Sequence, residues 1–219
     1  MESGAEPGTN ENVLKWRLII AATTGKRDYE RKDENPPQSV GGGKRILDPC
    51  CGSKMFWFDR ENPDVEFCDI RTVDNELIWQ SKDGTDKRFL TVCPDTVCDV
   101  RDMPFADETF WHIVFDPPHL THIGENAWLR KKYGVIPIDW QAFIREAFIE
   151  LYRVLKPNGT LIFKWAEIDI KTSELLKVIP YKPLYGHRSG KHMTTHWMAF
   201  IKDGEGQTQP EPKQTRMEL

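Results

Sequence analysis

The chain has 219 residues, of which 29% are charged and 39% hydrophobic, and its formal net charge at pH 7 is −4. This length suits one domain with a full core, and the acidic balance disfavours strong non-specific binding of nucleic acid by the whole surface. No apolar run is long enough to span a membrane, the acidic N-terminus does not resemble a signal peptide, and the five cysteines form no disulfide or zinc pattern. We therefore expect a cytoplasmic protein without a membrane partner or a metal.

The elements predicted in chain order alternate between strands and helices. A polar tail and lead-in cover residues 1–43, in which 13–22 fits either a strand or a helix, and a polar tail covers 203–219. The domain between them, 44–202, is predicted to contain strands at 45–47, 65–69, 96–100, 111–115, 160–165 and 194–201, a helical turn at 54–60, helices at 140–155 and 172–178, and turns at 81–86 and 186–190. Residues 156–159 are predicted to stop the helix at 140–155. Residues 74–95 are otherwise ambiguous. This alternation predicts an α/β fold with a mostly parallel sheet and helices on both faces.

A glycine-bearing motif follows the first predicted strand. Its residues are Asp48, Pro49, Cys50, Cys51 and Gly52. In an α/β sheet, ligands bind beyond the carboxyl ends of strands, where loops expose backbone N–H groups, and Gly52 would let the backbone approach a ligand closely. The motif therefore predicts a ligand-binding loop.

A second motif, Asp116-Pro117-Pro118-His119, follows the apolar strand predicted at 111–115. Proline fixes the backbone angle φ and offers a carbonyl without an N–H group of its own. A carboxylate beside such carbonyls makes a rigid acceptor corner, which could hold an amino group by two hydrogen bonds.

Together these motifs resemble those of S-adenosylmethionine-dependent amino-methyltransferases, in which Asp-Pro-x-x-Gly binds the cofactor and [Asp/Asn]-Pro-Pro-aromatic grips an exocyclic amine of adenine or cytosine. Residues 102–110 and 153–163 are similar to two further class I methyltransferase signatures. The resemblance covers 44–202 and implies a Rossmann-like fold with a seven-stranded sheet. It also implies that S-adenosylmethionine is the cofactor.

The resemblance also implies roles for strand-end carboxylates. Asp48 would lie near the sulfonium of the cofactor, and Asp69 would accept hydrogen bonds from the ribose hydroxyls. Asp99, with the backbone of Val100 beside it, would accept from the adenine amine.

In the acceptor corner, Asp116 and the carbonyl of Pro117 would accept the two hydrogens of the amine and so free the nitrogen lone pair for transfer. His119 holds the position where the family has an aromatic residue that stacks on the base. His122 and Trp128 are alternative stacking residues.

Two basic stretches, Arg130–Lys132 and Lys177–Lys202, are expected to contact DNA or RNA on the side where substrate enters. The gaps around the motifs leave no room for a full target-recognition domain, so we expect the substrate to be RNA, a short or relaxed DNA context, or a site presented by a partner protein.

Three alternatives remain open at this point. Asp116 and Lys164 resemble two members of the tetrad of ribose 2′-O-methyltransferases, in which the lysine helps to deprotonate a hydroxyl. A small-molecule methyltransferase and a non-catalytic subunit that keeps the fold are the other two.

Overall fold

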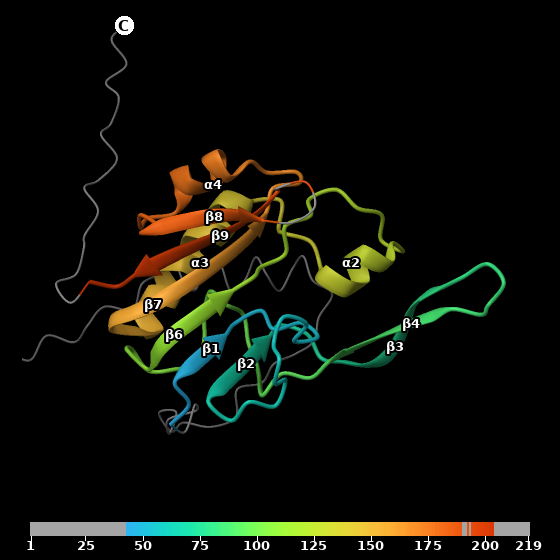
Figure 1. The fold of residues 1–219 in the computed structure, drawn as a ribbon, viewed down its shortest axis with the longest axis horizontal. Coiled ribbons are helices and arrows are strands. Elements are labelled where there is room, and N and C mark those ends of the chain that lie inside the picture. The colour runs from blue at the N-terminus through green and yellow to red at the C-terminus, as the bar shows by residue number, and fades with distance from the viewer. Residues whose placement is uncertain (1–42, 190–191, 193, 204–219) are drawn as a thin grey trace, which may run out of the picture. The chain divides into compact units, whose positions relative to one another are not determined.

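The computed structural model describes residues 43–189, 192 and 194–203 (Figure 1). The tails predicted at 1–43 and 203–219, with the apolar stretch 13–22, lie almost wholly outside the described residues. The described helices and strands are β1 (Ile46–Asp48), β2 (Val65–Asp69), β3 (Val73–Gln80), β4 (Lys87–Val92), β5 (Thr96–Val97), β6 (Phe110–Phe115), α2 (Trp128–Tyr133), α3 (Trp140–Val154), β7 (Leu155–Ala166), α4 (Thr172–Val178), β8 (Tyr185–Ser189) and β9 (Thr195–Ile201).

Seven strands form one sheet in the order β5-β2-β1-β6-β7-β9-β8. The first five are parallel to one another, whereas β9 runs antiparallel to both β7 and β8. All five residues of β2 are buried, as is typical of a central parallel strand covered on both faces. The predicted α/β class and the mostly parallel seven-stranded sheet are confirmed.

The main core lies between the sheet and α3. Asp139 caps this helix by accepting a hydrogen bond from the backbone N–H of Ala142 (3.3 Å), and one face of the helix carries its buried residues. The Phe148 ring contacts Phe115 of β6 at 5.9 Å and Phe163 of β7 at 5.1 Å between centroids. Helix α4 adds Leu175 to the same hydrophobic cluster. Among the described residues, no helix is both long and apolar enough to cross a membrane.

Strands β3 and β4 form a separate antiparallel hairpin, which Figure 1 shows projecting beyond the end of the sheet. A small apolar cluster of Ile78, Leu90 and Val92 joins its two strands, and Trp128 of α2 packs against this cluster. An ion pair between Lys131 and Glu76 (2.8 Å) adds a polar contact between α2 and β3. The ambiguous region of the sequence is thus a hairpin, and its polar turn at 81–86 is where the sequence predicted it.

The predicted bounds of the 65–69 strand and the 172–178 helix agree with β2 and α4. Four predictions were wrong. The strand predicted at 160–165 is β7, which already begins at Leu155 and therefore includes residues 156–159. Residues 54–60 form turns rather than a helical turn, with Lys54 at φ 55°. The turn predicted from residue 186 is largely strand β8, because an edge strand can be polar and exposed on both faces. The third strand is shorter than predicted, ending at Val97 rather than residue 100.

Candidate active site

A cavity of about 310 Å³ opens at the carboxyl ends of β1, β2 and β6. The chain runs from β1 to β2 on one side and places β6 on the other, so the crevice lies at the point where the strand order reverses. Ligands of open α/β sheets bind at such switch points, because the loops there diverge and leave backbone groups free. Eleven of the twelve predicted site residues line this cavity; Asp48 is the exception.

The loop after β1 forms one wall. Gly52 has φ +50°, and a Cβ added there would meet no atom within 4 Å, so the backbone is open to the cavity. The N–H of Cys51 donates to the carbonyl of Cys68 (2.8 Å), and that of Gly52 donates to Oδ2 of Asp69 (2.9 Å). These bonds tie the loop to β2. Burial raises the pKa of the Cys50 and Cys51 thiols, so both stay protonated at pH 7 and are poor nucleophiles.

Asp48 lies beneath that loop and is fully buried. Its carboxylate accepts hydrogen bonds from Nε1 of Trp57 (2.8 Å) and the N–H of Cys50 (3.3 Å). Burial raises its pKa to about 7, although both hydrogen bonds act in the opposite direction. In this structure Asp48 therefore shapes the loop from below.

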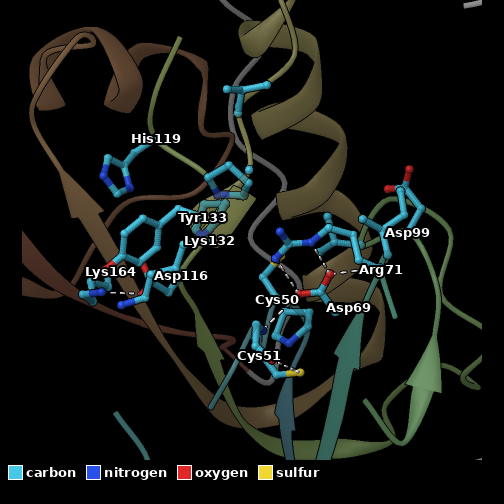
Figure 2. A pocket seen from close by; sticks show the side chains of 18 of the residues that line it. Cys50, Cys51, Asp69, Arg71, Asp99, Asp116, His119, Lys132, Tyr133 and Lys164 are labelled. Atoms are coloured by element: carbon cyan, nitrogen blue, oxygen red, sulfur yellow. Dashed lines mark hydrogen bonds and ion pairs between the residues drawn. The ribbon is translucent and has the colours of Figure 1, made fainter. Parts of the chain in front are cut away.

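Two strand ends carry the same arrangement of an aspartate and an arginine two residues later. In both pairs, Asp69–Arg71 and Asp99–Arg101, the backbone N–H and Nε of the arginine donate to Oδ1 of the aspartate at 2.9–3.1 Å. Figure 2 shows Asp69, Arg71 and Asp99 together on one side of the cavity. Burial raises the pKa of Asp99, but the hydrogen bonds and charge of Arg101 outweigh this effect and leave the pKa below its usual value. This carboxyl is ionised at pH 7.

The cavity fits a nucleoside-like ligand. Its acidic groups at two strand ends match hydroxyl and amine donors, and between them Ile70, at 65% exposure, offers an apolar surface for a base. Val100 and Phe143 add further apolar lining. The oxygens of Asp69 already accept from Gly52 and Arg71, so a ribose would share these oxygens with the protein donors.

The second motif forms the opposite side of the cavity. Asp116, Pro117, Pro118 and His119 all line it, and Lys164 of β7 forms an ion pair with Oδ2 of Asp116 (Figure 2). The Lys164 ammonium also lies 5.8 Å from the ring centroids of Phe56 and Trp197. Burial lowers the pKa of His119, which favours the neutral ring. His119 lies within 6.2 Å of Tyr133 and 6.3 Å of Trp165 between ring centroids, so it belongs to an aromatic wall.

Helix α2, which the sequence analysis missed, completes this wall. Lys132 and Tyr133 line the cavity, and the helix ends at Gly134, where the backbone adopts φ 73°. A Cβ at Gly134 would make an ordinary contact with the ring of Pro118 at 3.5 Å, so it is the positive φ that favours glycine at this position. The positions of Tyr133 and Lys132 come from tertiary packing. The Asp-x-Arg repeat, by contrast, was visible in the sequence.

The two predicted basic stretches do not form one surface. Arg130 donates to the carbonyl of Ile123 and Lys131 pairs with Glu76, while Lys132 reaches the cavity. Lys202 donates to the carbonyls of Tyr152 and Leu155 where β7 begins, at the end of that strand opposite the cavity. Lys177 pairs with Glu174 on α4. Of the alternative stacking residues, His122 hydrogen-bonds Thr121, and Trp128 packs against the hairpin.

Comparisons with known proteins find similarity at the level of structure. No protein-family model matches the sequence, and no curated protein matches it. Among solved structures, a TehB-like S-adenosylmethionine-dependent methyltransferase from Corynebacterium glutamicum is 13% identical over 87% of this chain and 95% of its own, with a TM-score of 0.43. A Burkholderia thailandensis 1,6-didemethyltoxoflavin-N1-methyltransferase is 13% identical over 72% of this chain and 70% of its own, with a TM-score of 0.39.

These similarities are distant, and the strand order and directions of the sheet define the fold. Five parallel strands are followed by an antiparallel β9 inserted between β7 and β8, and the cavity lies at the switch point. The fold is thus a Rossmann-like α/β fold with a mostly parallel seven-stranded sheet. The expectation drawn from the resemblance is confirmed at this level.

Proposed function

We propose that this chain is an S-adenosylmethionine-dependent methyltransferase that methylates an exocyclic amine of a nucleobase, N6 of adenine or N4 of cytosine, in DNA or RNA. The observation that carries the proposal is the shared cavity. The acceptor corner of Asp116, Pro117 and Pro118 faces the same space as the Gly52 loop and the strand-end carboxylates Asp69 and Asp99.

We assign the cofactor to the side of the cavity that contains Asp69 and Asp99. Asp69 would accept from the ribose diol, Asp99 and the Val100 backbone would bind the adenine edge, and the loop from Pro49 to Gly52 would hold the methionine end. When bound, the cofactor supplies an electrophilic methyl group. The chain contributes mainly proximity and alignment, because methyl transfer is an in-line displacement.

We assign the acceptor amine to Oδ1 of Asp116 and the carbonyl of Pro117. Lys164 engages Oδ2 of Asp116 and so fixes the orientation of the carboxyl group. Accepting both amine hydrogens draws the nitrogen toward tetrahedral geometry and frees its lone pair. His119 would stack on the base, and its neutral ring avoids placing a second cation beside Lys164.

A base within a duplex would have to be flipped out to reach this corner. The structure inserts one hairpin between β2 and β5 and one short helix after the second motif. Neither insertion has room for a full target-recognition domain. We therefore propose that the substrate is an accessible base in a single strand, or a base presented by a partner protein.

A ribose 2′-hydroxyl is the second candidate acceptor, and the ion pair between Lys164 and Asp116 favours it. A lysine beside a carboxylate can help to remove a hydroxyl proton. The two prolines that follow Asp116 are not required for that chemistry, so we rank the amine first.

The test is transfer of labelled methyl from S-adenosylmethionine to separate pools of DNA, RNA and small metabolites. Asp116→Ala should abolish transfer and leave cofactor affinity largely intact, whereas Asp69→Ala should weaken cofactor binding. The matched variant Asp116→Asn keeps an acceptor oxygen, so it should retain measurable transfer to an amine and lose transfer to a hydroxyl. Equal losses of cofactor affinity in Asp116→Ala and Asp69→Ala would contradict the assigned roles.

A further inference from the structure

A second cavity, of about 750 Å³, adjoins the candidate active site. Gly52, Ser53, Met55 and Lys132 line both cavities, so the two share a border. The second cavity runs between the loop after β1 and strand β4 of the hairpin, where Arg88, Phe89 and Leu90 line it. The proposed function does not use this space.

The lining combines cations with aromatic rings. Its cationic side chains are Lys54, Arg60, Arg88 and Lys132, against two carboxylates, Glu61 and Asp95. Asp95 forms an ion pair with Lys44 at 2.7 Å, and Lys44 also pairs with Glu66 at 3.0 Å. The Phe89 side chain is 53% exposed, and Met55 is 51% exposed at the border with the active site. The cavity is thus locally basic on a chain with a net charge of −4.

Arg88 is held in a fixed orientation. Its guanidinium carbon lies 4.9 Å from the ring centroid of Trp79 and 5.0 Å from that of Trp128. Stacking on two rings leaves the edge of the guanidinium, which carries the N–H donors, free to meet a planar or tetrahedral anion. The same contacts attach the hairpin to α2, which carries Lys132 and Tyr133 into the active site.

We propose that this second cavity binds the stretch of a single-stranded polynucleotide that flanks the target base, with Phe89 as a stacking platform and Arg60 and Arg88 on its phosphates. The inference rests on the proposed function and deepens it by naming the surface that holds the substrate. Proteins that bind single strands combine a cationic groove with aromatic side chains, because every nucleotide offers a phosphate and a base with a π-face. The shared border lets one nucleotide enter the active site while its neighbours occupy the second cavity.

The test uses the full chain and fluorescein-labelled single strands of about 12 nucleotides, one of DNA and one of RNA with the same sequence, followed by fluorescence anisotropy. Phe89→Ala should raise the dissociation constant about 5-fold or more, because loss of one stacking platform has at least that effect. Arg60→Gln should also weaken binding and should lower the slope of log Kd against log salt by about 0.7, since one phosphate contact is lost. A merely structural effect would not change that slope.

Lys177→Gln is the matched control, because it removes one exposed cation on α4, away from both cavities. It should leave the dissociation constant and the salt slope unchanged. Arg60 and Phe89 are both exposed, so their variants should stay folded and bind S-adenosylhomocysteine as the unmodified chain does. Comparing the DNA strand with the RNA strand shows whether the protein binds one or both.

Unchanged strand affinity in Phe89→Ala and Arg60→Gln would overturn the inference, as would equal weakening by Lys177→Gln. If polyglutamate at an equal concentration of charges displaces the nucleic-acid strand from the protein, the inference is also overturned, and an acidic protein segment becomes the better ligand of the second cavity. Failure of the proposed function is a separate result, since it would appear as strand binding without methyl transfer to any base.

Discussion

The buried Asp48 should make the protein less stable as pH rises from about 4 to about 8. Its folded-state pKa of about 7 exceeds the value of about 3.9 for an exposed aspartate, so the unfolded chain ionises this group first. The protonated carboxyl contributes its full stabilisation at pH values below its pKa in the unfolded chain. This contribution is lost as the pH rises through its pKa in the folded protein. A shift of roughly three units corresponds to about 4 kcal/mol in total, of which about 3 kcal/mol falls between pH 5 and pH 8.

Asp48→Asn removes this titration and leaves the other groups of the protein in place. We therefore expect the free energy of unfolding of the variant, relative to the unmodified chain, to rise by about 3 kcal/mol between pH 5 and pH 8. Urea unfolding at the two pH values measures it. Trp57→Phe removes a hydrogen bond that lowers the pKa of Asp48, so it should steepen the pH dependence of the chain that retains Asp48 and leave that of the Asp48→Asn variant unchanged. The reasoning would be refuted if the free energies of unfolding of Asp48→Asn and the unmodified chain differed by the same amount at both pH values.

Three further substitutions test the loop, the acceptor corner and the core. Gly52→Ala forces a side chain into φ +50°, so it should cost about 1–2 kcal/mol in urea unfolding and weaken cofactor binding in calorimetry. His119→Ala should raise KM or lower kcat if the ring stacks on the base, and unchanged kinetics would reject that role. Phe148→Ala leaves a cavity beside Phe115 and Phe163 and should lower stability by about 3–5 kcal/mol, with a smaller loss counting against tight packing there.

Much of the fold could be predicted because the central strands are buried and apolar. The strand Val65–Asp69 and the helix Thr172–Val178 carry clear local signals. The β3–β4 hairpin does not, since most of β3 is exposed and its sequence lacks a regular apolar alternation. Helix α2 has six residues, no buried side chain and no side-chain cap, so tertiary packing rather than local preference places it.

The predicted site residues that line the cavity lie at or just beyond the ends of strands. Asp69, Asp99 and Asp116 follow strands that belong to one sheet, and all three line one cavity. The sequence could not show that Asp48 points beneath the loop, because one residue decides whether a strand-end side chain faces the ligand or the core. The sequence brought Lys164 and Asp116 together only through the alternative resemblance to ribose 2′-O-methyltransferases, and the structure pairs their side chains across 48 residues of sequence.

The identity of the methylated atom tests the central claim most directly. DNA and RNA incubated with the chain and S-adenosylmethionine would be digested to nucleosides and analysed by mass spectrometry, with Asp116→Ala in parallel. The account predicts N6-methyladenine or N4-methylcytosine that disappears in the Asp116→Ala sample. A 2′-O-methyl nucleoside, or a methylated base that persists in the Asp116→Ala sample, would contradict it.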